Sequence, residues 1–177
     1  MLSNYNLEPS NISTNCAINL QINRVTSISQ QDKLKDIIKG GNTLVLVDRI
    51  KAGKILQEGL GDESVFISGS VKSADRREQY DEVQTADNKA IIATYGVASV
   101  GIDIPRIFNL VLLEPGKSFV RVIQSIGRGI RKAEDKDYLH VVDITSNLKY
   151  SKRHLTKRKA FYKEQGFPFT VTKVEYK

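Results

Sequence analysis

The apolar residues in the middle of the chain come in short continuous runs, near 43–48, 64–67, 89–94, 108–113 and 138–144. Runs of this length that are rich in Val, Ile and Leu are typical of strands buried on both faces of a parallel sheet. Helical spacing occupies the segments between them, near 50–60, 73–86 and 118–132, with a short helical turn near 97–100. Because strand and helix alternate, the pattern predicts an α/β fold in which helices sandwich a parallel sheet.

Weaker patterns flank this core. A helix is expected near 30–39, where Gly40-Gly41 would end it before the first strand of the core. The segment before it is polar, rich in Asn and Ser, and weakly periodic, so we interpret residues 1–29 as a linker or a remnant of a preceding element. Residues 30–145 are then one domain, and 146–177 are a C-terminal extension with a terminal strand near 169–174.

The segment 118–132 reads as an amphipathic helix with an unusual polar face. Ser118 is a suitable N-cap, and a buried stripe follows at Phe119, Val122, Ile123, Ile126 and Ile130. Gln124, Arg128 and Arg131 share a different face, on which two arginines could grip phosphate. Two glycines lie beside them, although each costs a helix about 1 kcal/mol against alanine. The alternative that remains open is a solvated arginine face with two tolerated glycines.

A second segment, upstream in the chain, favours the phosphate-binding interpretation of Arg128 and Arg131. In residues 91–105 a buried strand ends at Thr94, and small residues then lead to Gly101-Ile102-Asp103. With 124–131, it resembles motifs V and VI of superfamily 2 helicases. Residues 43–49 resemble motif IV, and residues 66–70 with the following arginines resemble the motif IVa region. The motifs stand in the family's order, and the resemblance covers about Asp32 to Asp143.

Within that superfamily the resemblance is closest to phage helicases of DNA recombination and repair, of the UvsW type, and to their XPB-like relatives. Motif VI begins with glutamine in these proteins and with His-Arg in DEAD-box proteins. The corresponding positions here are Gln124 and Ser125. The resemblance therefore favours DNA as the nucleic-acid partner, with RNA left open.

The resemblance implies a RecA-like C-terminal domain and a nucleotide site shared between two domains. ATP with Mg²⁺ would be held mainly by a first, N-terminal RecA-like domain, which this sequence does not contain. Arg128 and Arg131 would be arginine fingers on the γ-phosphate, and Gln124 a neighbouring phosphate or water contact. Gly101 and Asp103 would lie near the ribose. Phosphates of the nucleic-acid strand would be held at Gly69, Ser70, Thr94 and Tyr95.

One segment imitates the phosphate-binding motif of a nucleotide-binding domain. Gly116-Lys117-Ser118 lies between a strand and a helix, as in a P-loop, but that motif needs a glycine at position 111, which is Val111. Glu114 and Pro115 also supply a negative charge and remove an N–H where a phosphate cradle needs donors. With no Asp-Glu metal motif either, we expect this chain to be an ATP-dependent helicase only together with its first domain.

The net charge of the chain comes from its end. Residues 145–177 carry nine Lys and Arg against two Asp and Glu, which equals the +7 of the whole sequence. Basic residues among aromatic ones can follow a nucleic-acid backbone. We therefore expect phosphate contacts from Lys152, Arg153, Lys157 and Arg158. The alternative left open is a solvated helix face, or an extension that Phe161 and Tyr162 dock onto the domain.

Composition bounds the remaining possibilities. The 177 residues, 40% hydrophobic and 27% charged, are those of one ordinary globular domain. The sequence has neither a signal peptide nor an apolar run near membrane-spanning length, and its single Cys16 allows no internal disulfide, so we expect the cytoplasm of a bacterium or of a phage-infected host. The two histidines are far apart, and no metal site is expected. The runner-up function is a non-catalytic nucleic-acid-binding module that retains the fold.

Overall fold

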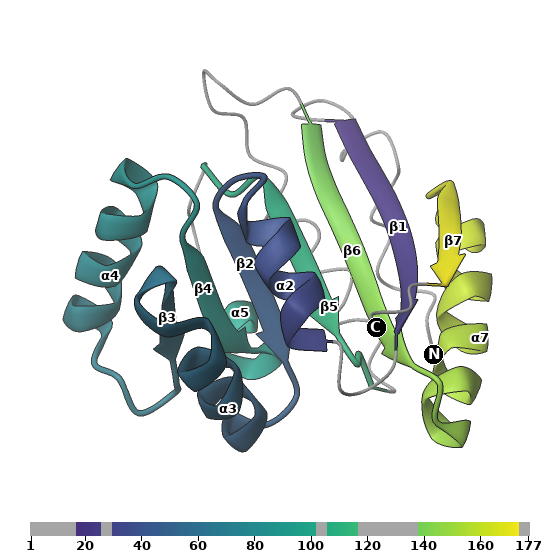
Figure 1. Ribbon diagram of the computed structural model, residues 1–177, viewed down its shortest axis with the longest axis horizontal. Helices are drawn as coiled ribbons and strands as arrows, with labels where there is room; N and C mark the ends of the chain where they lie inside the picture. The colour runs from purple at the N-terminus through teal and green to yellow at the C-terminus, as the bar shows by residue number, and fades with distance from the viewer. Residues whose placement is uncertain (1–16, 26–29, 102–105, 117–137, 174–177) are drawn as a thin grey trace.

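The computed structural model describes residues 17–25, 30–101, 106–116 and 138–173 (Figure 1). Its strands are β1 (Ala17–Val25), β2 (Thr43–Val47), β3 (Ser64–Ile67), β4 (Ala90–Thr94), β5 (Asn109–Leu113), β6 (Tyr138–Ser146) and β7 (Phe169–Lys173). Its helices are α2 (Gln30–Ile38), α3 (Ile50–Leu60), α4 (Ser73–Thr85), α5 (Tyr95–Gly101) and α7 (Lys149–Glu164), with a 3₁₀ turn, η2, at Gly61–Glu63. The strands expected from the apolar runs are confirmed, and the helix expected at 118–132 lies outside the described residues.

The seven strands form one sheet in the order β3-β4-β2-β5-β6-β1-β7, and every recorded pair is parallel. This confirms the predicted α/β fold with a parallel sheet. Because all strands run the same way, their carboxyl ends meet at one edge of the sheet, where ligands of open α/β folds usually bind. We call this the carboxyl edge.

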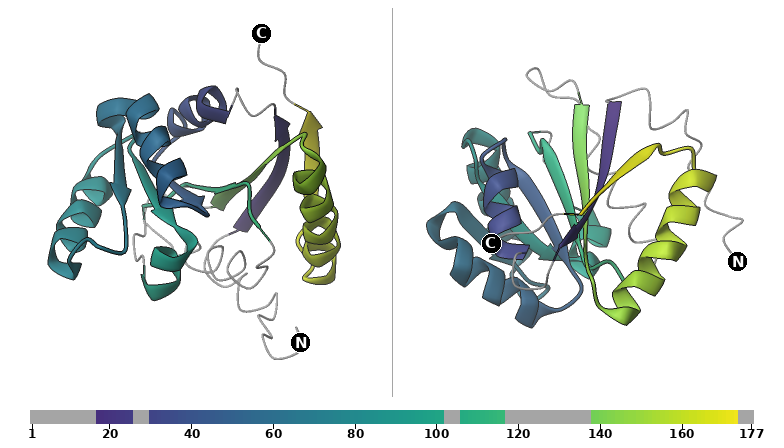
Figure 2. Two further views of the ribbon diagram at one scale, coloured as in Figure 1. Left: turned by 90° about the horizontal axis from the view of Figure 1, so that it is seen from below. Right: turned by 45° about the vertical axis from the view of Figure 1, so that its right-hand side comes forward.

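Helices cover both faces of the sheet (Figure 2). On one face, Leu34 and Ile38 of α2 and Leu56 of α3 pack against inward residues such as Val45 and Ile92. The other face carries α4, α5 and α7, whose buried apolar residues include Val83, Tyr95, Val97, Ala98, Leu155, Phe161 and Tyr162. The central strands are therefore buried on both sides, which explains their continuous apolar runs.

Residues 17–25 differ from the sequence interpretation. Instead of a linker they form β1, which lies between β6 and β7 in the sheet and pairs Leu20 with both Val141 and Phe169. Leu20 and Ile22 are buried, whereas the alternate residue Asn19 is exposed. Apolar and polar residues alternate over Ile18–Asn23, and this period of two was the signal that could have identified the strand.

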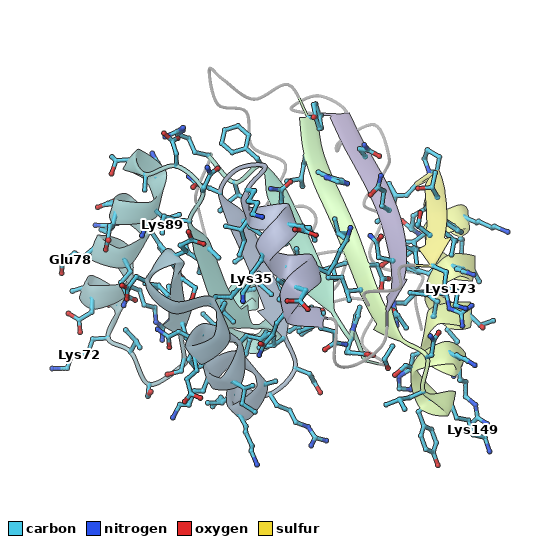
Figure 3. The ribbon with its side chains drawn as sticks, in the orientation of Figure 1. Lys35, Lys72, Glu78, Lys89, Lys149 and Lys173 are labelled. Carbon is cyan, nitrogen blue, oxygen red and sulfur yellow. The ribbon has the colours of Figure 1, made fainter. Side chains whose placement is uncertain are left out.

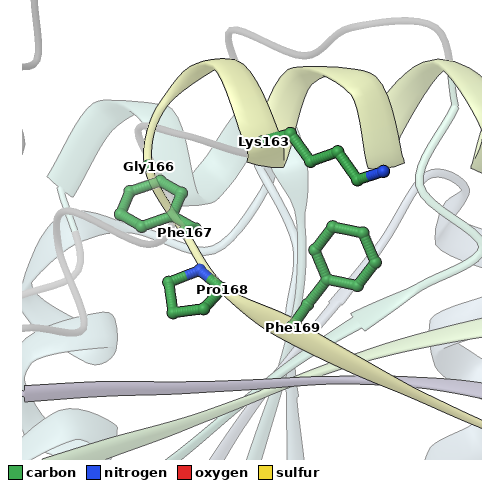
Figure 4. A pocket seen from close by; sticks show the side chains of 5 residues that line it. All are labelled: Lys163, Gly166, Phe167, Pro168 and Phe169. Carbon is green, nitrogen blue, oxygen red and sulfur yellow. The ribbon is translucent and has the colours of Figure 1, made fainter.

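The C-terminal extension is part of the same sheet. The chain leaves β6, runs back along the sheet as α7, and adds β7 beside β1 (Figure 1). The rings of Tyr162 and Phe169 pack edge to face, with their centroids 6.0 Å apart. At the turn between α7 and β7, Lys163 and Phe169 help to line a shallow hollow (Figure 4). Phe161 and Tyr162 are thus anchors that dock the extension, one of the two alternatives left open above.

Candidate functional site

Two of the predicted nucleic-acid contacts lie side by side at the carboxyl edge. β3 and β4 are neighbours in the sheet, and Ile67 pairs with Ala93 near their ends. Residue Thr94 and the loop after Ile67 therefore leave the sheet at the same level. Because β4 also pairs with β2, Asp48 and Arg49 follow the next strand at that edge.

The loop after β3 presents its backbone to solvent. Gly69 and Ser70 are both exposed, and a Cβ added at Gly69 would meet no atom within 4 Å. The loop is held from within by a hydrogen bond of 2.7 Å between the hydroxyls of Ser68 and Ser70, and by Arg76 Nη2, which donates to the Gly69 carbonyl at 2.9 Å. Nothing in the described chain crowds this glycine, so a ligand can approach its backbone closely.

Thr94 and Tyr95 have different surroundings although they are adjacent. The half-buried Thr94 caps α5, because its Oγ1 accepts the Val97 N–H at 3.3 Å. The Tyr95 ring is buried, with 4% of its surface exposed. Burial raises the pKa of the Tyr95 phenol well above its ordinary value, and the charge of Asp143 raises it further. The predicted strand contact from Tyr95 is therefore corrected, because its side chain belongs to the core.

Arg158 requires the same correction, for a stronger reason. Its side chain is 1% exposed, and its Nε and Nη2 donate to the two Asp143 oxygens at 2.8 and 3.0 Å. Nη2 also donates to Thr145 Oγ1, and Nη1 donates to the Pro115 carbonyl at 2.8 Å. Tyr162 completes the cluster by donating its hydroxyl to Asp143 at 2.9 Å. The guanidinium makes four hydrogen bonds inside the protein and is too deeply buried to reach a phosphate.

The hydrogen-bonded geometry of Arg158 and Asp143 keeps the buried Arg158 side chain charged. Burial by itself lowers the pKa of the Arg158 guanidinium, but the charge and hydrogen bonding of Asp143 outweigh it, and the pKa is raised. A bidentate arginine–carboxylate pair that also hydrogen-bonds to Thr145 and Pro115 has the geometry in which a buried ion pair is tolerated. The pair ties α7 to β6 and to the chain that leaves β5.

The exit from β5 is shaped by internal contacts. Glu114 has a left-handed backbone, with φ of 44°, and its Oε1 accepts the Ser146 N–H at 2.7 Å and Gln30 Nε2 at 3.1 Å. The carbonyl oxygen of the next residue, Pro115, accepts the hydrogen bond from Arg158 Nη1. A carboxylate held at this position disfavours a phosphate, in line with the view that Gly116-Lys117-Ser118 is not a P-loop.

The outer face of α7 remains basic. Lys152, Arg153 and Lys157 are exposed, whereas Leu155 and Tyr162 point to the core from the opposite side of the same helix. Lys149 projects from the first turn of α7 (Figure 3). We call Lys149, Lys152, Arg153 and Lys157 the basic face. It begins at the carboxyl edge, since α7 starts three residues after β6 ends.

Several sequence-predicted residues cannot be placed. Asp103, Gln124, Arg128 and Arg131 lie outside the described residues. Gly101 is the last residue of α5.

In the part of the chain that is described, no cluster of His, Cys, Asp and Glu could hold a metal ion, and no helix is long and apolar enough to cross a membrane.

Comparison with known proteins agrees with this architecture. The chain is 28% identical to the ATP-dependent DNA helicase uvsW of Enterobacteria phage T4 over 133 residues, which are 70% of this chain and 26% of that protein. It is 32% identical over 107 residues to a viral protein named as a helicase, from Sulfolobus islandicus filamentous virus, covering 59% of this chain and 19% of the other. The chain thus spans about a fifth to a quarter of these relatives.

Solved structures show the same fold. The crystal structure of T4 UvsW matches 90% of this chain with a TM-score of 0.64 at 21% identity, over 42% of its own length. The C-terminal domain of the DEAD-box protein Dbp5 matches 90% of this chain and 91% of its own, with a TM-score of 0.67 at 19% identity. The sequence model of the helicase conserved C-terminal domain matches residues 29–133, and the chain belongs to that family.

Proposed function

We propose that this chain is the second RecA-like domain of an ATP-dependent DNA helicase or translocase. In this proposal the domain holds the backbone of one nucleic-acid strand and supplies cationic groups to an ATP site shared with a first RecA-like domain. The observation that carries the proposal is the placement of Thr94 and the exposed Gly69 loop at the ends of adjacent strands. Family membership supports it, as does the similarity to uvsW, whose name describes an ATP-dependent DNA helicase.

The strand contacts would use small groups at the carboxyl edge. The exposed backbone at Gly69 and Ser70 and the hydroxyl of Thr94 can donate hydrogen bonds to phosphate oxygens, which position a strand without reading its sequence. The absence of a Cβ at Gly69 lets the strand approach closely. Such contacts suit an enzyme that moves along nucleic acid of any sequence.

The nucleotide contacts would come from residues around motifs V and VI. Arg128 and Arg131 are proposed as arginine fingers, Gln124 as a phosphate or water contact, and Gly101 and Asp103 as residues near the ribose. Positive charge on the transferring phosphoryl group stabilises its transition state. The exit from β5 is already engaged by Ser146 and Arg158, so the triphosphate and Mg²⁺ would be held by the first domain.

The basic face would add phosphate contacts outside the carboxyl edge. Each neutralised phosphate contributes about 0.7–0.9 to the slope of log affinity against log salt concentration. Changing Lys152, Arg153 and Lys157 together to Gln is expected to weaken binding of unrelated DNA sequences and to flatten this slope by about two to three. The measurement is a salt titration of DNA binding, followed by fluorescence anisotropy.

A matched variant controls for total charge. Lys35, Lys39 and Lys54 are exposed on α2 and α3 or just beyond, in the layer on the opposite side of the sheet from α7. Changing these three to Gln removes the same charge and should leave the slope within about half a unit of the wild type, because the proposal assigns them no phosphate. Equal slopes in the two triple variants would contradict a specific role for the basic face.

A further inference from the structure

The aromatic residues of the C-terminal extension are not equivalent. Phe161, Tyr162 and Phe167 are all buried and serve the core. Tyr150 is 70% exposed in the first turn of α7, the largest exposed fraction among the large hydrophobic residues of the described chain. Beside it, Leu148 is 63% exposed. The basic face therefore has an apolar tip, at the end of α7 that lies at the carboxyl edge.

The positive charge around Tyr150 indicates which kind of partner this apolar tip would bind. Arg153 lies one helical turn beyond Tyr150 on the same side of α7, and Lys149 directly precedes Tyr150; both cations are exposed. No acidic residue lies in the first turn of α7. Exposed cations attract a polyanion, and an exposed aromatic ring packs against a flat apolar group. Nucleic acid with unpaired bases offers both partners, because it has a phosphate backbone and free base faces. In duplex DNA the base faces are stacked on one another and are not offered to a side chain.

The first residues of α7 are not those that best stabilise the start of a helix. Its N-cap is Leu148, which makes no side-chain capping hydrogen bond, and the first helical residue is a lysine. A capping side chain would contribute about 0.5–2 kcal/mol, and an acidic residue in the first turn about 0.3–1 kcal/mol. The start of α7 therefore carries apolar and cationic side chains in place of stabilising ones, as the start of α3 also does.

We propose that Tyr150 stacks on an unpaired base of single-stranded nucleic acid whose phosphates lie on the basic face. This inference rests on the proposed function and adds a preference for single strands over duplex. The ring supplies a stacking surface, and the phenol oxygen is not required. Recognition is independent of sequence, because every base has a flat face.

The test is direct binding of fluorescein-labelled oligo(dT) and of a blunt duplex of the same length to the 177-residue chain. Stacking is worth about 1–3 kcal/mol per base, so Tyr150→Ala should weaken oligo(dT) binding by about 5- to 150-fold. Tyr150→Phe should bind within about twofold of the wild type, since it keeps the ring. Duplex binding should be unchanged in both variants, and so should the salt slope.

The control is Tyr138→Ala. Tyr138 is a second exposed tyrosine, 56% exposed, but it begins β6 at the opposite edge of the sheet and should not affect binding. Urea denaturation of each variant checks that the fold is intact. Oligo(dT) affinity of Tyr150→Ala within twofold of the wild type would overturn the inference, as would an equal loss of duplex binding or an equal loss in Tyr150→Phe.

The two proposals fail in different ways. An unchanged salt slope in the Lys152, Arg153 and Lys157 triple variant contradicts the phosphate contacts of the proposed function. A normal slope change in that variant, together with no effect of Tyr150→Ala, contradicts only the stacking. A wild-type chain that binds neither probe at low salt would contradict both.

Discussion

Replacing either Arg128 or Arg131 by alanine is expected to lower kcat for ATP hydrolysis by at least about 10³-fold, in an enzyme that joins this domain to its first RecA-like domain. An arginine finger neutralises charge that develops on the transferring phosphoryl group, and its loss is typically worth about 10³–10⁵ in rate. Because this interaction is made in the transition state, KM for ATP and DNA affinity should change little.

The measurement is steady-state ATPase activity with saturating single-stranded DNA, together with DNA binding of the same variants. Arg106→Ala is the control, since Arg106 pairs with Asp87 at 3.0 Å and precedes β5 at the amino edge of the sheet. It should keep kcat within about twofold, because the proposal gives it no contact with ATP. A loss below about tenfold at Arg128 or Arg131 would place that arginine on a solvated surface.

Replacing Arg158 by methionine is expected to destabilise the domain by about 3–5 kcal/mol. The substitution keeps a long apolar side chain but leaves Asp143 as an uncompensated buried charge, with 0% of its surface exposed. It also removes the donors to Thr145 and Pro115. This is a large part of the stability of an ordinary domain. Urea denaturation of the 177-residue chain measures it.

A second substitution separates the lost charge pair from lost packing. Asp143→Leu in the Arg158→Met background removes the orphaned charge, so the double variant should be more stable than Arg158→Met alone. Lys157→Met, one residue away on the exposed side of α7, should stay within about 0.5 kcal/mol of the wild type. Arg158→Met within 1 kcal/mol of the wild type would contradict the structural role given to the pair.

The central strands were predictable because helices cover them on both faces of the sheet. β2 is buried at all five of its residues and β5 at all five of its own, and in each strand a single polar residue is followed by an unbroken apolar run. β1 was missed because its buried Leu20 and Ile22 alternate with Asn and Gln residues, which resemble those of a polar linker although Asn23 is buried as well. Its partner strands are β6 and β7, more than a hundred residues away, and no local signal contains that pairing.

The site was predictable where a backbone position defines it and less so where a side chain does. Gly69 and Thr94 follow the ends of two buried strands, and parallel pairing brings such ends together. Arg158 was counted with the surface cations because the basic segment was considered as a whole. Its spacing from Leu155 and Tyr162 places it on the inward side of α7, which helical periodicity alone could have indicated. Its partner Asp143 could not be inferred without the fold.

Our central proposal for this domain is that it completes an ATP site but has no nucleotide-hydrolysing site of its own. The most direct test is ATP hydrolysis by the purified 177-residue chain with Mg²⁺ and single-stranded DNA. The expected result is no hydrolysis above background, because the exit from β5 is engaged by Ser146 and Arg158, and Val111 stands where a P-loop needs its first glycine. Hydrolysis above background that is lost in Lys117→Ala would contradict the account.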